Sequence, residues 1–464
     1  MDIVSEKGFD LANSKSFAIG MIDGARRENE PRGLVFLERM YYHQTLSNNN
    51  PVTMRAVLTF EEALEKILKH SKRRLPLKAP IDRSLGFVLA EEIRAREEIP
   101  LFNSSSVDGF AVRISDIKDA SQKNPVRLPV QGTVSAGSAS PAALKPGYTM
   151  KVMTGAPLPP KTESVVMKEF VALSGENAIF KAPTKEGASV RSRGEEFSKK
   201  EIVFGKGTVV TPPVVGMCAA LGYPTIKVFR KPTIALVITG NELRSPSAVL
   251  RAGQIRDSNS FALSAALASI RIVPSPILFA RDKREVLSRA FARALKRADV
   301  VISAGGVSVG DFDFVKEVLG NLRVRTIFWR VAMKPGKPNF FGVRGKKLVF
   351  GLPGNPVSAM VSLETLVFPA LRKMMGVRHS ISLNHEAVLT TELRKGKGRT
   401  EFVRATAVMS PSGGWNVSPT RGQGSHMIGG LAQANCMIIV PRDRENLAKG
   451  ERVSIRFFSW NVTS

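Results

Sequence analysis

The hydrophobic pattern between residues 230 and 378 alternates between continuous apolar runs and segments with helical periodicity. Three apolar runs end in glycine, namely TIALVITG (233–240), ADVVISAGG (298–306) and KLVFGLPG (347–354). The helix-compatible segments that follow are NSFALSAALASI (259–270), DFVKEVLGNL (313–322) and NPVSAMVSLETLVFPALRKMMG (355–376). Strands without polar alternation are buried on both faces, so the pattern predicts a parallel α/β sheet with helices on both sides.

The flanking regions have a different pattern. Residues 100–199 carry short β-like runs between stretches rich in Gly, Pro and Ser, which predicts a small β-rich domain with long loops. After Gly376 the chain returns to β-like runs, which predicts a C-terminal β domain over 379–464. We therefore expect a multidomain α/β plus β protein.

Two further segments, 54–99 and 200–229, are expected to form a mixed linking domain. Thr59 and Glu62 form the capping-box pattern that begins an amphipathic helix. A second helix is expected after Pro212, ending at Gly222. Residues 1–53 show weak periodicity and are expected to be a poorly ordered extension, with Met54 as the functional start.

Composition bounds the function classes. A length of 464 residues favours two to four domains. The 68 basic and 40 acidic residues give a net charge of +28, which attracts polyanions. The basic residues are spread along the whole chain and aromatic residues for base stacking are few, so we expect nucleic-acid binding to be nonspecific if it occurs.

The remaining composition points to a cytoplasmic protein. Cys218 and Cys436 both lie in apolar contexts, as reduced, buried thiols do. No apolar run is long enough for a membrane span, and the first thirty residues do not resemble a secretory signal. The five histidines are scattered, which argues against a zinc site.

The motif GGVSVGDFDF (305–314) carries the first candidate chemistry. It follows an apolar strand, and ligands of parallel α/β sheets bind at the carboxyl ends of the strands. Glycines there allow backbone N–H groups to approach an anion, and Ser308 can donate a hydroxyl to a phosphate oxygen. Asp311 and Asp313 would repel phosphate unless a cation such as Mg²⁺ lies between them. Asp311 can equally be a helix N-cap, whereas for Asp313 we favour a metal ligand.

Other strand ends repeat this theme. Glu242 in VITGNEL follows a strand terminus and could reach the same cation, although it could also be a simple helix-terminal charge. Lys334 and Lys337 lie on a proline-bounded turn and could neutralise an oxyanion, although such pairs are usually solvated. The loop GLPGNPVSA (351–359) has two prolines that suit a rigid pocket wall.

Eight motifs together resemble the molybdopterin molybdenumtransferase family, the molybdenum insertases that also include the C-terminal domain of gephyrin. In order they are SSVDGFAV (105–112), MTGAPLP (153–159), RSRGEEF (191–197), ITGNEL (238–243), GQIRDSN (253–259), GGVSVGDFDF (305–314), AMKPGKP (332–338) and GLPGNPVSA (351–359). The likeness runs from about Met54 to the C-terminus.

This resemblance implies a Mg²⁺-assisted reaction in which molybdate and adenylylated molybdopterin give molybdenum cofactor and AMP. It also implies a homodimer in which the α/β domain of one subunit and the small β domain of the other share a site, and other proteins of molybdenum cofactor biosynthesis as partners.

The site residues implied by the resemblance fall into three groups. Asp313 and Glu242 are the expected Mg²⁺ ligands. Asp108 and Thr154 are the expected contribution of the small β domain. The expected contacts to phosphate, oxyanion and pocket wall are Gly305, Gly306, Ser308, Gly310, Lys334, Lys337, Asp282, Pro353, Pro356, Ser358, Arg404 and Ser425.

Two positions depart from the family pattern. Phe110 stands where an aromatic with a hydroxyl is common, and Glu196 stands where an aspartate is usual. Neither change removes an expected metal or anion contact.

Two alternatives stay open at this point. The adenylyltransferase of the same pathway shares the α/β fold, although the flanking β regions and the MTGAP motif favour the insertase. A scaffold role like that of gephyrin would need a partner-binding feature that the sequence does not display. The sequence does not distinguish molybdate from tungstate as the substrate.

Overall fold

A computed structural model describes residues 57–139, 141–306, 314–378 and 383–461 of the chain. The expected N-terminal extension, 1–53, lies outside the described residues, as do Ser308, Gly310, Asp311 and Asp313. The domain boundaries given above stay a prediction.

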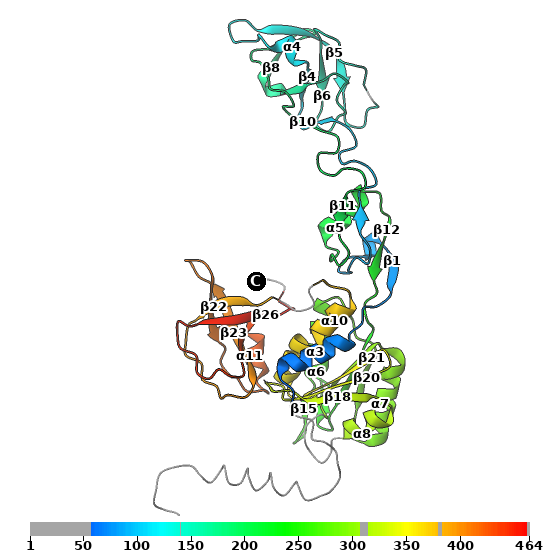
Figure 1. The fold of residues 1–464 in the computed structure, drawn as a ribbon, viewed down its shortest axis with the longest axis vertical. Coiled ribbons are helices and arrows are strands. Elements are labelled where there is room, and N and C mark those ends of the chain that lie inside the picture. Colours follow the sequence, from blue (N-terminus) through cyan, green and yellow to red (C-terminus); the bar gives the residue numbers. More distant parts are fainter. Residues whose placement is uncertain (1–56, 140, 307–313, 379–382, 462–464) are drawn as a thin grey trace, which may run out of the picture. The chain divides into compact units, whose positions relative to one another are not determined.

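The predicted α/β sheet is present as six strands in the order β16-β13-β17-β21-β20-β18. Three of these strands, β18, β20 and β21, are labelled in Figure 1. Their bounds are β13 (Ile234–Thr239), β16 (Ile277–Ala280), β17 (Val300–Ala304), β18 (Arg325–Arg330), β20 (Pro338–Arg344) and β21 (Lys347–Leu352). β13 pairs in parallel with β16 and β17, and β17 with β21. The three apolar runs singled out in the sequence are therefore the three adjacent central strands.

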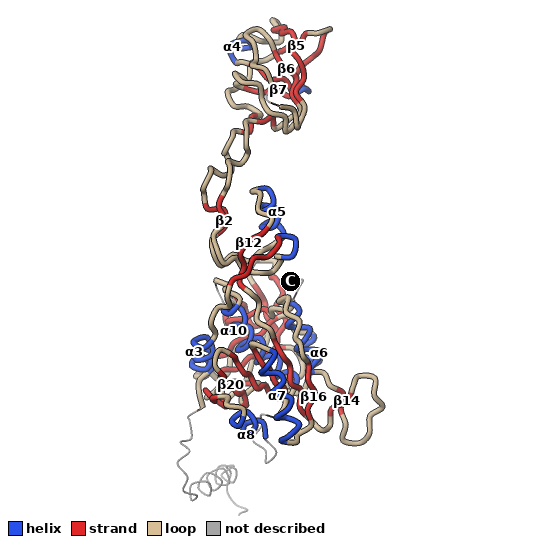
Figure 2. The backbone as a smooth tube through the Cα atoms, turned by 90° about the vertical axis from the view of Figure 1, so that its right-hand side faces the viewer, coloured by secondary structure: helices blue, strands red, loops and turns tan. Residues whose placement is uncertain are grey.

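Helices cover this sheet on both faces, as predicted (Figure 2). Ile234, Leu236 and Ile238 of β13 pack into the core that contains α6 (Asn259–Ser269), α9 (Pro356–Ser362) and α10 (Phe368–Met374). Ala235 and Val237 face the opposite way, toward α7 (Arg284–Arg297) and α8 (Phe314–Asn321). A π-helical turn, η3 (Leu363–Val367), joins α9 and α10.

The predicted parallel strands β16, β13, β17 and β21 are present, and the sheet is mixed because antiparallel strands extend it on one side. β20 runs antiparallel to both β21 and β18. Arg344 pairs with Lys347 across a two-residue turn, and Gly345 at its first position has a φ of +57° that favours glycine. A connection this short can only reverse the chain, so the strands on either side must be antiparallel.

The small β region contains a six-stranded sheet in the order β7-β4-β6-β5-β9-β8. Phe110 is buried there against Phe180, with an edge-to-face ring contact at 6.4 Å. The elements are β3 (Ser104–Ser105), β4 (Gly109–Val112), α4 (Ile114–Ile117), β5 (Val126–Val134), β6 (Thr149–Val152), β7 (Ser164–Met167), η2 (Lys168–Phe170), β8 (Val171–Ser174), β9 (Asn177–Phe180) and β10 (Val190–Arg191).

The described residues of the segments expected to link the domains form two small antiparallel sheets, two α-helices and one short 3₁₀ helix. Helix α3 (Phe60–His70) begins with the predicted capping box, in which the Thr59 hydroxyl accepts from the Glu62 N–H and the Glu62 carboxylate accepts from the Thr59 N–H. Helix α5 (Pro212–Ala220) is followed by Gly222 at a φ of +73°. The other elements are β1 (Pro76–Pro80), η1 (Ile81–Arg83), β2 (Ile93–Arg94), β11 (Ile202–Phe204) and β12 (Thr225–Phe229).

The C-terminal β region closes on itself, because β23 pairs with both β24 and β25. Its elements are β22 (His385–Leu389), β23 (Thr400–Met409), β24 (Trp415–Pro419), α11 (Ile428–Ala432), β25 (Cys436–Val440) and β26 (Arg452–Phe457). The short strand β19 (Met333–Lys334) comes from the α/β region and pairs in parallel with β23. This pairing joins the two regions next to a predicted site residue. Two remaining short strands, β14 (Leu243–Arg244) and β15 (Ile255–Arg256), pair in parallel just before α6.

Candidate functional site

Two carboxylates follow neighbouring strands at the carboxyl edge of the sheet. Thr239 and Ala280 are paired at the ends of β13 and β16, and Glu242 and Asp282 come shortly after them. The Asp282 N–H donates to the Asn241 side-chain oxygen at 3.2 Å, which ties the two strand ends together. The sequence predicts each acid as a site residue, and the structure brings these two together.

Burial raises the pKa of Asp282, and the negative charge of Glu242 raises it further. Two carboxylates that repel each other are stabilised by a shared cation, and Mg²⁺ needs only one or two protein carboxylates beside waters and phosphate oxygens. The donor set therefore fits Mg²⁺. Within the described ranges there is no cluster of three or more His, Cys, Asp or Glu side chains that could hold a metal. The other expected ligand, Asp313, lies outside those ranges.

Glu242 folds back over Gly240. A Cβ added at Gly240 would lie 2.9 Å from both Glu242 carboxylate oxygens, and the φ of Gly240 is +150°. A glycine is thus needed at the strand end for Glu242 to take this position.

Gly305 and Gly306 form a tight turn after β17, and this turn packs directly against Thr239. A Cβ on Gly305 would lie 2.5 Å from the Thr239 carbonyl oxygen, and one on Gly306 would lie 2.7 Å from a Val315 methyl. Both glycines have positive φ, +95° and +65°. The Gly305 N–H donates to the Leu352 carbonyl at 3.1 Å, so it does not have the free N–H that we expected for anion binding. Gly305 therefore contributes shape to the turn and no free N–H donor.

The loop from Pro353 to Pro356, which we call the wall loop, lies next to this turn. Pro353 is buried, and Pro356 is the first residue of α9, where a missing N–H has no cost. A Cβ on Gly354 would lie 3.5 Å from the Gly305 Cα, an ordinary contact distance. Ser358 is buried within α9.

Ser425 contacts the wall loop directly, and Arg404 acts on it indirectly, by binding the residues just before Ser425. The Arg404 guanidinium is buried and donates to the carbonyls of Gly422, at 2.8 Å, and Gly424, at 3.3 Å. Ser425 follows, and its hydroxyl accepts from the Asn355 amide at 3.0 Å. Arg404 therefore holds the loop that carries Ser425. Its Nε has no partner among the described residues, and burial lowers the pKa of the guanidinium.

Lys334 and Lys337 are both exposed, and Lys334 has a partner that the sequence did not predict. Lys334 pairs with Glu401 in the register of β19 and β23, and its ammonium lies 3.2 Å from the Glu401 carboxylate. Glu401 itself is largely buried. The ammonium retains two further N–H donors for an oxyanion.

Asp108 and Thr154 are brought together in the small β region. The Asp108 carboxylate accepts from both the N–H and the hydroxyl of Thr154, each at 2.9 Å, and lies 3.1 Å from the Lys168 ammonium. These hydrogen bonds, with that of the Thr154 N–H the largest effect, lower the pKa of Asp108 to about 2. Lys168 was not predicted, because nothing in the sequence links it to a residue sixty positions earlier.

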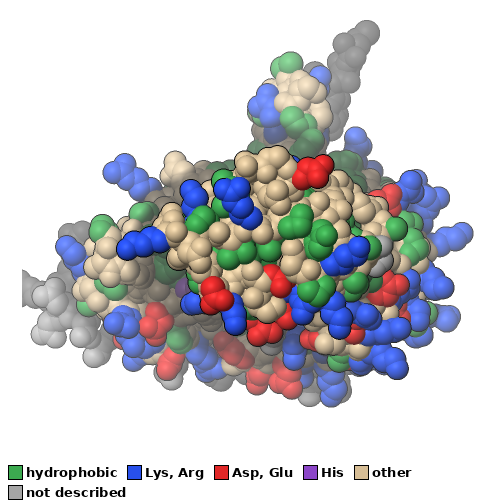
Figure 3. All heavy atoms as spheres, turned by 90° about the horizontal axis from the view of Figure 1, so that it is seen from above, with side chains coloured by type: hydrophobic (Ala, Val, Ile, Leu, Met, Phe, Trp, Pro, Cys, Tyr) green, Lys and Arg blue, Asp and Glu red, His purple; other side chains and the backbone are tan. Residues whose placement is uncertain are grey.

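The surface is basic without a dominant basic patch on the face that Figure 3 displays, where Lys and Arg side chains are interspersed with Asp and Glu. In the part of the chain that the structure describes, no helix is both long and apolar enough to cross a bilayer.

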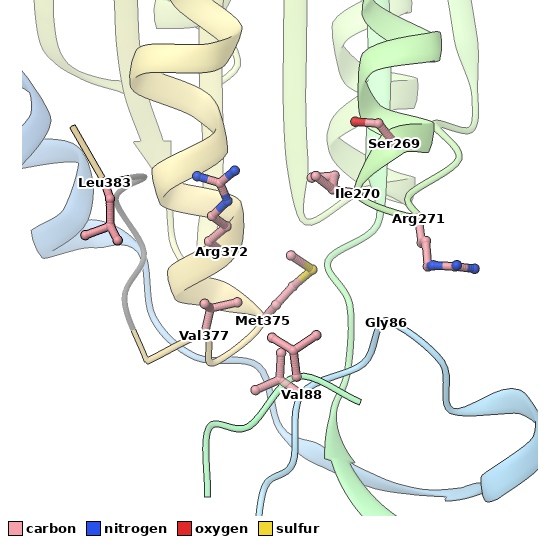
Figure 4. A pocket seen from close by; sticks show the side chains of 10 residues that line it. Gly86, Val88, Ser269, Ile270, Arg271, Arg372, Met375, Val377 and Leu383 are labelled. Atoms are coloured by element: carbon pink, nitrogen blue, oxygen red, sulfur yellow. The ribbon is translucent and has the colours of Figure 1, made fainter. Parts of the chain in front are cut away.

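One cavity, of about 440 Å³, lies away from the carboxyl edge (Figure 4). It is next to Ser269 and Ile270 at the end of α6, whereas the wall-loop contacts are made by Asn259 at its beginning, roughly 15 Å away along the helix. None of the predicted site residues that the structure describes lines it. The residues that do are Gly86, Val88, Val209, Ser269, Ile270, Arg271, Arg372, Met375, Val377 and Leu383.

Three protein-family models match the chain. They are the MoeA N-terminal region (domains I and II) over residues 58–222, a probable molybdopterin-binding domain over 235–373, and the MoeA C-terminal region (domain IV) over 386–458.

Whole-chain relatives agree with these matches. The chain is 32% identical over 410 residues to a molybdopterin molybdenumtransferase from Haemophilus influenzae. The alignment covers 87% of this chain and 99% of that protein. It is 32% identical over 404 residues to one from Staphylococcus epidermidis, with 87% and 96% covered.

A solved molybdopterin biosynthesis MoeA protein from Pyrococcus horikoshii has a similar fold. It has 30% sequence identity and a TM-score of 0.72, and the similarity covers 87% of this chain and 99% of that chain.

Proposed function

This chain belongs to the family of molybdopterin molybdenumtransferases, and from that membership we propose that it inserts molybdate into adenylylated molybdopterin with release of AMP. The observation that carries the proposal is the placement of Glu242 and Asp282 after neighbouring parallel strands, beside a glycine turn at the carboxyl edge, with Asp282 hydrogen-bonded to the residue before Glu242. That edge is where α/β sheets bind their ligands.

We propose that Glu242 and Asp313, the two ligands predicted from the sequence, hold Mg²⁺, and that Asp282 is a further ligand. A bound Mg²⁺ would neutralise phosphate oxygens and so make the pyrophosphate a better electrophile. Holding such an ion relieves the repulsion between the carboxylates of Glu242 and Asp282, and it favours the ionised form of Asp282.

The remaining residues bind and orient the substrates. Lys334 and Lys337 supply positive charge for molybdate, and Ser425 offers a hydroxyl next to Asn355. Arg404 fixes the Ser425 loop, and the rigid loop from Pro353 to Pro356 forms one wall. Ser308, Gly306 and Gly310 are the proposed phosphate contacts of the turn, and Ser358 completes the wall.

We also propose that the active form is a homodimer in the cytoplasm, working with the other enzymes of this pathway. Asp108 and Thr154 would then reach the α/β site of the partner subunit. The hydrogen bonds that keep Asp108 ionised suit a carboxylate that accepts from a substrate donor.

The test is anaerobic incubation of the full chain with adenylylated molybdopterin, Mg²⁺ and molybdate, with each omitted in turn. The proposal predicts AMP release only when all three are present. AMP release without molybdate would indicate simple hydrolysis, and pyrophosphate release from ATP and molybdopterin would indicate the adenylyltransferase reaction instead. The family relationship does not favour that second reaction.

A further inference from the structure

Two buried polar atoms at the carboxyl edge have no hydrogen-bond partner among the described residues. They are Oγ1 of Thr239 and Oδ1 of Asn259, and the two residues are 4% and 8% exposed. A buried polar atom without a partner destabilises the fold, so each such atom in a native protein needs an explanation.

The Thr239 hydroxyl lies against the glycine turn. It is 2.7 Å from the position of a Cβ on Gly305 and 3.0 Å from that of a Cβ on Gly306. A side chain on Gly305 would therefore collide with Thr239, and one on Gly306 would collide with Val315 and crowd the Thr239 hydroxyl. A threonine hydroxyl can donate one hydrogen bond, and here that donor is unused.

The orientation of the Asn259 amide is fixed by its other contact. Asn259 is the first residue of α6, and its Nδ2 donates to the Gly354 carbonyl at 2.8 Å. A flipped amide would place two oxygens at that distance, so the nitrogen must face Gly354. Oδ1 is therefore an unused acceptor.

The two atoms belong to one contiguous arrangement. Thr239 packs on Gly305, Gly305 lies next to Gly354, and Gly354 is held by Asn259. A free donor and a free acceptor thus flank the contact between the two glycine loops, which is where the proposed function places the phosphate of the substrate.

We propose that Thr239 and Asn259 are binding residues for the organic substrate. The Thr239 hydroxyl donates to a phosphate oxygen, and the Asn259 side-chain oxygen accepts from an N–H or O–H donor of the same ligand. Molybdate is fully deprotonated at neutral pH and offers no donor, so Asn259 selects for the organic substrate over the oxyanion. This inference rests on the proposed function for the identity of the ligand.

The test compares ligand affinity with stability in the full chain, with AMP plus Mg²⁺ and molybdate alone as the probes. Thr239→Val keeps the shape and removes the hydroxyl. We expect its melting temperature without ligand to be unchanged or higher, and its Kd for AMP to rise about 3- to 10-fold. Thr239→Ser keeps the hydroxyl and should bind AMP like the wild type. Asn259→Ala should weaken AMP binding by a similar factor and leave molybdate binding unchanged.

Ser264→Ala is the matched control, because the Ser264 hydroxyl also lacks a partner among the described residues and lies five residues further along the same helix. It should leave the Kd for AMP unchanged. Wild-type AMP affinity in both Thr239→Val and Asn259→Ala would overturn the inference. Equal weakening of AMP and molybdate binding by Asn259→Ala would also overturn it, since that result indicates a collapsed wall loop. If these binding results hold and the wild type releases no AMP from adenylylated molybdopterin, the proposed function fails while the two residues remain ligand contacts.

Discussion

The ammonium of Lys334 lies 3.2 Å from the carboxylate of Glu401, the residue opposite it in the β19–β23 pairing. Lys334 is half exposed and Glu401 is largely buried. The buried carboxylate therefore holds the lysine side chain in place, and the exposed ammonium keeps donors for other ligands. The negative charge of Glu401 also weakens the attraction of Lys334 for an oxyanion.

We therefore expect Glu401→Gln to lower the KM for molybdate about two- to fivefold, as removal of one nearby charge in a solvated site should. Steady-state AMP release at varied molybdate measures this. Glu392→Gln is the control, because Glu392 forms an exposed ion pair with Arg394 elsewhere in the same region. A higher KM in Glu401→Gln would mean that Glu401 acts mainly by positioning Lys334.

Asp108 should titrate with a midpoint near pH 2 in the folded protein. A depressed carboxyl pKa stabilises the fold above the unfolded value of 3.8, and this contribution is lost as the pH falls from there toward 2. Thr154→Val removes the hydroxyl donor and keeps the N–H donor, so the midpoint should move up but stay below 3.8. Carboxyl ¹³C chemical shifts followed against pH give both values. An unshifted midpoint of 3.8 in the wild type would contradict the hydrogen bonding described here.

Gly305 should tolerate no side chain, whereas Gly354 should accept one. At Gly305 a Cβ would lie 2.5 Å from a backbone oxygen at a φ of +95°, while at Gly354 its nearest contact is an ordinary 3.5 Å. We expect Gly305→Ala to lower the free energy of unfolding by about 1–3 kcal/mol and Gly354→Ala to change it by less than about 0.5 kcal/mol. Urea denaturation measures both. Equal effects would show that the turn does not pack on Thr239 in this way.

Gly240→Ala should abolish the stabilisation of the folded protein by Mg²⁺. The added methyl collides with the flexible end of Glu242, so the carboxylate moves, and the φ of +150° strains the backbone, so the melting temperature without Mg²⁺ should also fall. Mg²⁺ should raise the melting temperature of the wild type, because a ligand of the native state stabilises it. This increase should be lost in Gly240→Ala. Gly132→Ala, with open space around the added methyl, is the control and should retain the full increase. A retained Mg²⁺ effect in Gly240→Ala would exclude Glu242 as a ligand.

Local patterns predicted the central strands and the capping box, because burial on both faces and helix capping each leave a signature within a few residues. Glu242 was predicted as a site residue from its position after a strand, and Asp282 was predicted from the family resemblance. The pairing of these two was not predicted, because it depends on β13 and β16 being neighbours in the sheet.

Longer-range relationships were missed for the same physical reason. The contact of Lys334 with Glu401 depends on a strand pairing between residues 67 positions apart.

Helix α7 was not predicted, although its apolar positions recur with helical spacing, at Leu287, Phe291, Ala294 and Leu295. The buried amide of Asn259 looks in sequence like an ordinary polar residue at a helix start.

The central claim is that a divalent cation binds between the ends of β13 and β16. A crystal of the full chain soaked with Mn²⁺ and AMP tests it most directly, since the anomalous signal locates the ion. The account predicts a peak within about 2.5 Å of a carboxylate oxygen of Glu242 or Asp282. A crystal with AMP bound and the metal peak elsewhere, or no peak at all, would contradict it.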